Sequence, residues 1–323
     1  MLKPITLVSR QSPLAVAQAV AIRAMLGKAA RVPPEDWETA FPLQTHVTTG
    51  DKNLASSLSE VGGKGLFVKE IEAALINGSA RIAIHSMKDM PAIMPEGLVL
   101  AAIPPREDPR DAFVTLQGEP LSAIAAGARI GTSSVRRGAQ LRRLRDDIEV
   151  VPFRGNVGTR LSKLSDGVAE GTFLAEAGLR RLGHDEVKRV PMATDEMLPA
   201  LGQGVLCIQT REDDTEARAL CERINCPDTE RVSCVERAFL KALDGSCRTP
   251  MAGLAELTGD TMRFRAEILS LDGSEAQTHD GTFDAGGHGE LIALSDAEAH
   301  GTKIAERLLE RASPALKTAL SHA

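Results

Sequence analysis

The sequence predicts an α/β fold for its first part and a small α+β region at its end. Short strand-like apolar runs alternate with helical segments up to about residue 182, with a proline-rich hinge at 104–109. From about residue 227 a helix precedes three successive strand-like segments. Alternating strands and helices are typical of parallel sheets covered by helices on both faces. Ligands of such folds gather beyond the carboxyl ends of the strands, so candidate site residues are expected there.

The first strand and the first helix have the clearest local signals. Residues 5–8 are a short β-like run, and Ser12-Pro13 follows it. A serine at the N-cap and a proline in the first turn favour a helix start. Apolar residues then recur at helical spacing from Leu14 to Met25. The other elements predicted before the hinge are a strand near 41–47, a helix over 67–75 and strands at 82–84 and 98–103.

The alternation resumes after the hinge and then changes character. The predicted strands are 112–115, 129–131, 148–153 and 172–175, and the predicted helices are 134–144, 159–164 and 177–182. The terminal region is predicted as a helix over 229–243, strands at 251–257, 262–271 and 276–283, and a helix over 297–312. This pattern indicates two α/β lobes and one α+β lobe.

Composition narrows the classes of function. The chain is 43% hydrophobic and 25% charged, as in ordinary globular proteins, and its net charge of −6 argues against generic nucleic-acid binding. The N-terminus lacks the apolar region of a secretory signal, and no apolar run approaches the roughly 20 residues that span a bilayer. The five cysteines are an odd, scattered set, which fits reduced thiols. We expect a cytoplasmic protein without membrane or nucleic-acid partners.

Several predicted strands end in polar residues instead of plain turns. Lys88 and Asp89 follow one buried strand, although a surface turn explains them equally well. Thr132, Ser133 and Ser134 follow another, and the helix behind them carries two arginines in its first turn. Cations there oppose the helix dipole, so a bound anion is the better explanation. Arg10 and Ser12, and a segment containing Arg154 and Arg160, repeat the pattern at two further strand ends.

The arginines of this central region are concentrated within a short stretch. An acidic protein with such a concentration suggests a small polyanion as ligand, and a solvated helix face is the alternative. The members of the stretch are Arg136, Arg137, Arg142, Arg143, Arg145, Arg154 and Arg160.

Two loops are candidates for chemistry or gating. The segment 61–65 is rich in glycine but is not a phosphate-binding Walker loop, because Lys64 is followed by glycine. It is either a lid whose Lys64 meets an anionic ligand or a plain loop. Cys247 stands on a predicted loop beside Arg248, a setting that favours a reactive thiolate. Cys221 and Cys226 lack the spacing of a zinc site, so no metal is expected.

These segments, in this order, resemble the hydroxymethylbilane synthase (porphobilinogen deaminase) family over about residues 5–255. The matching strings are Arg10-Gln11-Ser12-Pro13-Leu14-Ala15, Val61 to Phe67, His85-Ser86-Met87-Lys88-Asp89, Arg106 to Ala112, Gly131 to Arg137, Arg154 to Arg160, Ala177 to Gly183, Gly202-Gln203-Gly204, and the loop of Cys247.

The resemblance implies a fold and an activity. The fold would comprise two α/β domains like those of periplasmic binding proteins and a small α+β domain. Its boundaries would be 1–104 with 205–224, then 105–204, and 225–323. The enzyme would join four porphobilinogens head to tail with release of ammonia, then hydrolyse off linear hydroxymethylbilane. Growth would occur on a dipyrromethane cofactor held by a thioether to Cys247. The product would pass to uroporphyrinogen-III synthase, and the enzyme would be a monomer.

The resemblance also implies the site residues. Asp89 and Lys88 would be catalytic, with Asp89 stabilising a cationic pyrrole. The cofactor would be bound by Cys247, Asp89, Lys88, Ser86, Thr132, Ser133, Ser134, Arg136, Arg137, Arg160 and Gly178. The substrate would be bound by Arg10, Ser12, Lys64, Phe67, Arg154, Arg181 and Gln203. Such arginines suit the acetate and propionate groups of each pyrrole.

The chain departs from the family pattern at three places. Glu60 stands where some relatives carry lysine, Glu170-Gly171-Thr172-Phe173 replaces a more usual strand start, and Glu176 occupies a commonly apolar position. The last two are expected to weaken packing of the second domain. Two rival hypotheses remain: a non-catalytic two-lobed binding protein for a small carboxylate, and a family member that assembles its cofactor but turns over poorly.

Overall fold

The computed structural model describes residues 3–52, 65–245, 249–286 and 292–321. They fall into two compact units, which are taken one at a time below. The first contains the described residues up to 107 together with 205–230, and the second contains the described residues of 108–204 and 231–323. No helix of these ranges is long and apolar enough to cross a membrane.

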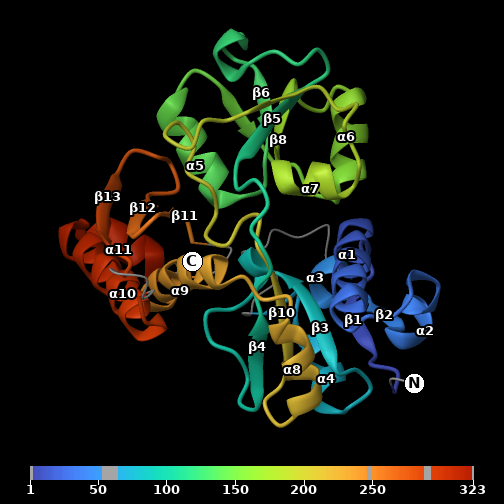
Figure 1. Ribbon diagram of the computed structural model, residues 1–323. Helices are drawn as coiled ribbons and strands as arrows, with labels where there is room; N and C mark the ends of the chain where they lie inside the picture. The colour runs from blue at the N-terminus through green and yellow to red at the C-terminus, as the bar shows by residue number, and fades with distance from the viewer. Residues whose placement is uncertain (1–2, 53–64, 246–248, 287–291, 322–323) are drawn as a thin grey trace. The chain divides into compact units, whose positions relative to one another are not determined.

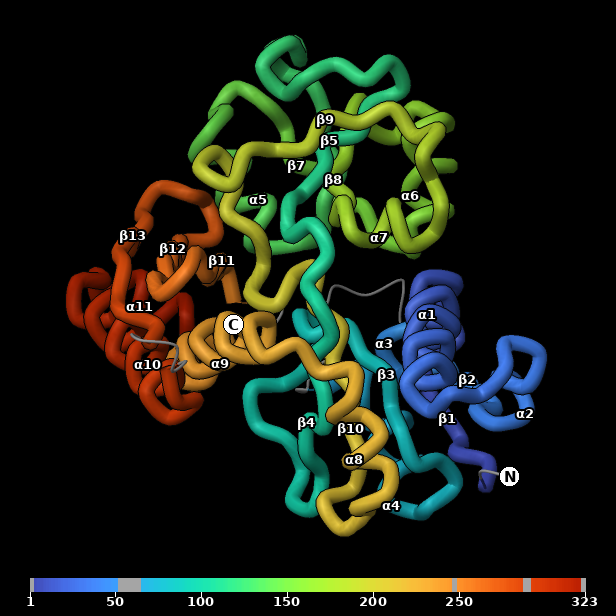
Figure 2. The backbone as a smooth tube through the Cα atoms, viewed as in Figure 1, coloured from blue at the N-terminus to red at the C-terminus, as the bar shows by residue number. Residues whose placement is uncertain are grey.

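The first unit is built on a five-stranded sheet of order β2-β1-β3-β10-β4. β1 pairs in parallel with β2 and β3, whereas β10 runs antiparallel to β3 and β4. Figure 2 shows β10, from late in the chain, lying between β3 and β4. The strands are β1 (Leu7–Arg10), β2 (Leu43–His46), β3 (Ile82–Ser86), β4 (Leu98–Ala102) and β10 (Leu206–Arg211). The sheet is therefore mixed, not wholly parallel as predicted.

Helices cover both faces of this sheet. The helices α1 (Pro13–Ala29) and α8 (Thr215–Glu222) share an apolar cluster with Leu7, and α4 (Lys69–Ile76) shares a second cluster with Val8. Adjacent strand residues point to opposite faces, so these neighbours anchor opposite layers. Ser12 caps α1 as predicted, because its side chain accepts a hydrogen bond from the Ala15 N–H. The shorter helices are η1 (Pro34–Asp36), α2 (Trp37–Ala40), α3 (Thr49–Lys52) and η2 (Met87–Asp89).

The second unit contains a sheet of the same design, with order β7-β6-β8-β5-β9. β6 pairs in parallel with β7 and β8, and β5 runs antiparallel to β8 and β9. In both sheets the fourth strand in spatial order therefore opposes its neighbours. The strands are β5 (Asp111–Thr115), β6 (Arg129–Gly131), β7 (Glu149–Val151), β8 (Gly171–Ala175) and β9 (Arg189–Pro191).

The helices of this second sheet also occupy both faces. Figure 1 shows α5 (Val135–Leu144) on one side of the strands, and α6 (Val157–Ser165) and α7 (Glu176–Arg181) on the other. Phe113 packs in the cluster on the α5 side, and Ala112 packs in the cluster on the α6 and α7 side. One further short helix, η3 (Leu121–Ala123), lies between β5 and β6 in sequence.

A small antiparallel sheet, β11-β12-β13, completes the second unit. Its core joins the three strands to long helices, with Phe239 and Phe264 in edge-to-face contact at 5.5 Å. A Cβ at Gly301 would collide with the Val235 carbonyl, so glycine allows α10 to approach α9 closely. The elements are α9 (Pro227–Ala242), β11 (Met251–Thr258), β12 (Thr261–Leu269), β13 (Ala276–Asp284), α10 (Leu294–Arg311) and α11 (Pro314–Ser321).

The predicted class, two α/β sheets followed by a small α+β region, is confirmed. The predicted strand over 41–47 is shorter, because Phe41 ends α2 and is fully buried. The helices α2, α8 and α11 were not predicted. The exact boundaries of the three predicted domains stay a prediction.

Candidate functional site

The first group of candidate residues lies at the carboxyl ends of β1 and β3. Arg10 is the last residue of β1, and η2, directly after β3, carries Lys88 and Asp89. These two strands are parallel neighbours, so their ends share one edge of the sheet. Arg10 Nη1 lies 3.4 Å from Asp89 Oδ2, and the two side chains are 23% and 30% exposed. The structure thus brings together the predicted catalytic aspartate and a predicted substrate arginine.

Arg10 is also held by Asp51, a residue that the sequence analysis did not identify. Both Asp51 oxygens accept from Arg10: Nη2 pairs with Oδ1, and Nε lies 3.3 Å from Oδ2. The Arg10 guanidinium carbon lies 4.3 Å from the centroid of the Phe67 ring. Thr48 fixes Asp51 through its backbone N–H at 3.2 Å and its hydroxyl at 2.7 Å.

The charges of this group reinforce one another. Burial lowers the pKa of Arg10, but hydrogen bonding and charge from Asp51 and the charge of Asp89 outweigh burial and raise it. Burial raises the pKa of Asp51, but the hydrogen bonds from Arg10 and Thr48 outweigh it and hold that pKa below its usual value. Arg10 and Asp51 are therefore both charged at neutral pH.

A series of buried side-chain hydrogen bonds lies next to the end of β3. His85 Nε2 lies 3.1 Å from Gln209 Oε1, and Gln209 Nε2 donates to Glu72 Oε1 at 3.0 Å. Burial lowers the pKa of His85 to about 4, so its imidazole is neutral at physiological pH. Ser86 donates to Gln18 Oε1 at 3.1 Å. These contacts tie β3 to its neighbours immediately before Lys88 and Asp89.

In the second unit, the side-chain hydroxyls of Thr132, Ser133 and Ser134 form hydrogen bonds just before and at the start of α5. Ser134 caps the helix by accepting from the Arg137 N–H at 3.4 Å. Thr132 Oγ1 accepts from the Ser134 N–H at 3.2 Å, and Ser133 Oγ accepts from the Phe153 N–H at 2.9 Å. Their oxygens therefore hold the backbone between β6 and α5.

Arg136 and Arg137 converge on a buried carboxylate from the protein itself. Asp111 Oδ2 lies 2.7 Å from Arg136 Nη1, and Asp111 Oδ1 lies 2.6 Å from Arg137 Nη2. Gln203 Nε2 adds a bond to Asp111 Oδ1 at 2.9 Å. Burial raises the pKa of Asp111, but the two arginines outweigh it and depress that pKa strongly. The sequence analysis predicted a bound anion at the start of α5, whereas the structure pairs these two arginines with Asp111 of the chain itself. A ligand role for these two arginines stays a prediction.

Arg160 is a second cation of this unit. Its Nε donates to the Gly155 carbonyl at 3.0 Å, and no carboxylate of the described ranges pairs with Arg160. Burial and the positive charges of Arg137 and Arg154 lower the pKa of Arg160 to about 10. The guanidinium is still charged at neutral pH, so this part of the unit favours binding of an anion.

The remaining predicted site residues have mixed outcomes. Arg181 Nη2 donates to the Gly204 carbonyl at 2.7 Å, and Gly178 is buried in α7. Ser12 serves as the cap of α1. Lys64 and Cys247 lie outside the described residues. Within the described residues, no group of three or more His, Cys, Asp or Glu side chains could hold a metal ion.

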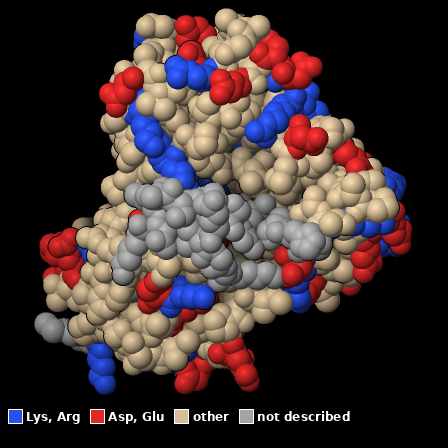
Figure 3. Space-filling model, turned by 180° about the vertical axis from the view of Figure 1, so that it is seen from behind, with Lys and Arg blue, Asp and Glu red and all other residues tan. Residues whose placement is uncertain are grey.

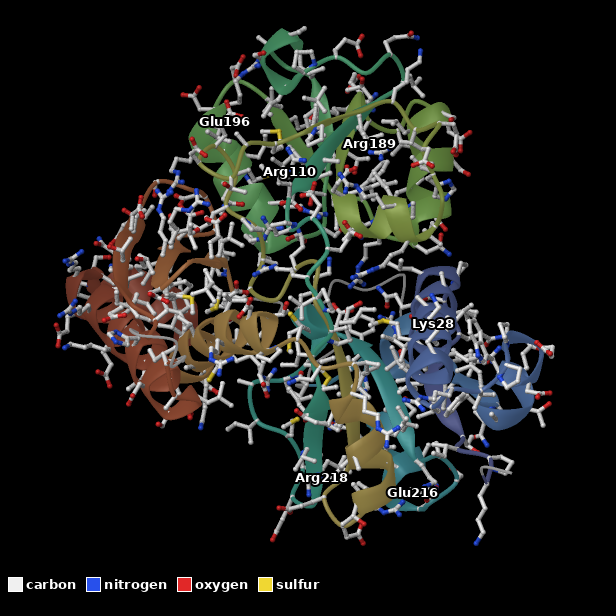
Figure 4. The ribbon with its side chains drawn as sticks, in the orientation of Figure 1. Lys28, Arg110, Arg189, Glu196, Glu216 and Arg218 are labelled. Atoms are coloured by element: carbon white, nitrogen blue, oxygen red, sulfur yellow. The ribbon has the colours of Figure 1, made fainter. Side chains whose placement is uncertain are left out.

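Two departures from the family pattern are compensated by ion pairs. Glu176, almost fully buried, receives Arg189 Nε at 2.9 Å and Arg180 Nε at 3.1 Å. Arg189 is labelled in Figure 4. Glu170 accepts from the Arg129 N–H at 2.7 Å and pairs with Arg129 Nη2 at 3.3 Å. Both acidic residues thus have a local counter-charge, and the weakening of the second domain stays a prediction. Glu60 lies outside the described residues.

The Asp111 cluster yields a stability prediction. We expect Asp111→Asn to lower the free energy of unfolding at pH 7 by about 3–5 kcal/mol, because two buried guanidiniums lose their counter-charge. The folded-state pKa of Asp111 is depressed, so this stabilisation is complete above the ordinary aspartate pKa of about 4 and declines as the pH falls. Denaturant unfolding at pH 7 and at about pH 3.5 measures both effects.

Asp147→Asn is the matched control, because Asp147 pairs with Arg145 at the surface. It should change the midpoint little. An Asp111→Asn protein as stable as the parent at pH 7 would contradict the role given to this carboxylate.

Comparison with known proteins identifies the family. Residues 5–219 match the family model "Porphobilinogen deaminase, dipyromethane cofactor binding domain", and residues 231–310 match "Porphobilinogen deaminase, C-terminal domain". The chain belongs to the porphobilinogen deaminase family. It is 48% identical over 309 residues to the porphobilinogen deaminase of Paracoccus denitrificans, covering 96% of this chain and 95% of that protein. It is 44% identical over 310 residues to that of Nitrobacter winogradskyi, covering 95% and 93%.

The family resemblance predicted from the sequence is therefore confirmed. Among solved structures, a probable amino-acid ABC transporter extracellular-binding protein from Bacillus subtilis matches with a TM-score of 0.39 at 13% identity, covering 69% of this chain and 90% of that one. Because this TM-score is low, we describe the fold by the strand orders given above and draw no argument from this similarity.

The family implies a dipyrromethane cofactor, and the residues present fit such a group. Dipyrromethane carries several carboxylates, and the second unit offers Arg160 without a carboxylate partner among the described residues, near the charges of Arg137 and Arg154. Guanidinium groups bind carboxylates in a bidentate fashion. Figure 3 shows acidic and basic side chains interspersed over the face that it draws.

Proposed function

We propose that this chain is a hydroxymethylbilane synthase, a transferase that joins four porphobilinogens and releases ammonia and linear hydroxymethylbilane. The observation that carries the proposal is the family match over residues 5–219, which includes Asp89 in its contact with Arg10. The enzyme thereby acts in tetrapyrrole biosynthesis. The rival hypothesis of a non-catalytic binding protein is disfavoured by relatives at 44–48% identity named as deaminases.

Asp89 is the proposed catalytic carboxylate. Its side chain is 30% exposed, so it can reach a ligand while Arg10 holds it at 3.4 Å. Positive charge develops on a porphobilinogen pyrrole as ammonia leaves, and a fixed carboxylate stabilises that charge. A hydrogen bond from the pyrrole N–H to Asp89 would orient the ring. Lys88 adds a positive charge beside it for substrate carboxylates.

Arginines of both units supply the proposed carboxylate sites. Arg10 in the first unit and Arg154 and Arg181 in the second would bind acetate and propionate groups of the substrate. When bound, dipyrromethane supplies the free α-carbon on which the pyrrole chain grows. We assign its covalent attachment to Cys247. Its carboxylates would be held by Arg136, Arg137 and Arg160. Ser86, Thr132, Ser133, Ser134 and Gly178 would also contact the cofactor. The proposed substrate set further includes Lys64, Phe67, Ser12 and Gln203.

The finer aspects of the biology are also proposals. The described cysteines Cys207, Cys221, Cys226 and Cys234 form no disulfide with one another, which supports a reducing, cytoplasmic location. The product is linear, so an enzyme that closes the ring, uroporphyrinogen-III synthase, would consume it. We propose that the enzyme works as a monomer.

The intact holoenzyme provides the direct test. Protein purified from cells that make porphobilinogen should exceed the sequence mass by two pyrrole units, and Ehrlich's reagent should colour it after denaturation. Incubation with porphobilinogen should give uroporphyrin I after oxidation. A pure binding protein would show neither result, and a member that assembles its cofactor but turns over poorly would show only the first. An unmodified mass would count strongly against the proposal.

A further inference from the structure

Arg10 already holds a carboxylate in the geometry that a substrate carboxylate requires. A guanidinium binds a carboxylate best through two parallel N–H bonds from one edge. The Nε and Nη2 edge of Arg10 is occupied by the two oxygens of Asp51. One face of the guanidinium stacks on Phe67, and Nη1 points to Asp89. A bidentate ligand at the Nε and Nη2 edge must therefore displace Asp51.

We propose that Asp51 is a resident carboxylate that occupies Arg10 in the free enzyme and is exchanged for a carboxylate of the incoming pyrrole. The inference rests on the proposed function, because it takes Arg10 as a substrate-binding residue. It assigns Asp51 a specificity role: only a ligand that brings its own carboxylate can replace it without leaving the Nε and Nη2 edge of Arg10 unpaired.

The charge balance favours exchange over simple binding. Arg10 is partly buried, with 23% of its side chain exposed. A guanidinium in that position without a counter-charge is destabilised by loss of hydration. Asp51 neutralises it in the free enzyme, and a substrate carboxylate neutralises it in the complex. One pair is broken as another forms, so the Nε and Nη2 edge of Arg10 keeps a counter-charge throughout, while Nη1 stays near Asp89.

The local structure allows Asp51 to leave without disturbing the sheet. Asp51 lies in α3, a helix of four residues, and among the described residues its other hydrogen bonds come from Thr48, three residues earlier. Its side chain is 22% exposed, so the released carboxylate is close to water. Asp89, by contrast, is the last residue of η2, which follows β3 directly.

Exchange has a measurable consequence for apparent affinity. A site that is largely occupied by an internal competitor binds its ligand more weakly by the fraction of time that it is free. Removing the competitor should therefore strengthen substrate binding and leave the chemical step unchanged. A residue that only positions Arg10 would have the opposite effect, because its loss would weaken binding or slow turnover.

Asp51→Asn in the holoenzyme tests the proposal. The Asn oxygen can still accept from Thr48 and from Arg10 Nε in the place of Oδ2, whereas its NH2 group, in the place of Oδ1, cannot accept from Nη2. The internal competitor then lacks its charge and one of its two bonds to Arg10, so a substrate carboxylate should displace it more easily. We expect KM for porphobilinogen to fall at least about fivefold, with kcat within about twofold of the parent. Asp51→Glu keeps the carboxylate and should return KM toward the parental value.

The controls separate this proposal from the proposed function. Asp280→Asn removes a carboxylate that pairs with Arg263 on the third sheet and should leave KM and kcat unchanged. Asp51→Ala removes both acceptors from the Nε and Nη2 edge of Arg10 and replaces Asp51→Asn if the latter unfolds. A raised KM, a fallen kcat or an unchanged KM in the folded Asp51 variants overturns the exchange. Parent holoenzyme that does not consume porphobilinogen refutes the proposed function instead.

Discussion

Replacing Asp89 by asparagine should lower the turnover of porphobilinogen at least about 100-fold, which corresponds to about 2.7 kcal/mol of transition-state stabilisation. Asparagine keeps the size and hydrogen-bonding capacity of the side chain but removes the negative charge that faces a cationic pyrrole. Arg10 should stay in place, because Asp51 still binds two of its nitrogens. The loss is therefore expected in kcat, with little change in fold.

The measurement is kcat at saturating porphobilinogen on matched holoenzymes, with thermal unfolding as the check on folding. Asp280→Asn serves again as the reference, since it deletes a carboxylate from a surface ion pair. If Asp89→Asn turns over at a near-parental rate, the charge of Asp89 is not catalytic and the role proposed for it is wrong.

Much of the fold could be predicted because its signals are local. The alternation of apolar runs indicated the helices and strands, and Ser12 and Ser134 marked helix starts through bonds to N–H groups three residues ahead. The direction and place of β10 had no such signal. It enters the first sheet between β3 and β4 from more than a hundred residues away, and pairing of that kind depends on the whole fold.

The site residues could be predicted where they lie at or just after the ends of strands. Arg10 and Asp89 come together because β1 and β3 are parallel neighbours. Their carboxylate partners were harder to foresee. Asp51 is 41 residues from Arg10, and Asp111 is 25 residues from Arg136. A sequence shows the excess of arginines near α5 but does not show which carboxylate they meet.

Glu176 also shows that a sequence does not reveal the partner of a charged residue. An acidic residue at a commonly apolar position predicts weaker packing when considered alone. In the structure Arg189, at the start of β9, supplies the matching charge from 13 residues away. A departure from a family pattern can thus be judged only with its partner in view.

The described cysteines differ in burial, and this difference selects the control for a test of Cys247. Among the described cysteines, Cys207 and Cys221 are buried, and burial raises the pKa of Cys221 to about 12, which leaves its thiol protonated and unreactive. Cys226 is only partly buried and is the matched control, because serine there keeps a similar polarity and size. Cys226→Ser should retain the covalent pyrrole and the parental activity.

Cys247→Ser should abolish both the covalent pyrrole and the activity. The attachment needs a thiolate that attacks an activated methylene carbon and forms a bond that lasts through turnover, and a serine hydroxyl is a far weaker nucleophile at neutral pH. Arg248, next in sequence, favours the thiolate of Cys247. The variant should also unfold at a lower temperature than the parent, since bound cofactor stabilises only the native state. Intact mass, uroporphyrin formation and thermal unfolding measure the three effects. Sustained activity of Cys247→Ser, or a pyrrole mapped by peptide analysis to another cysteine, would refute the assignment of the cofactor to Cys247.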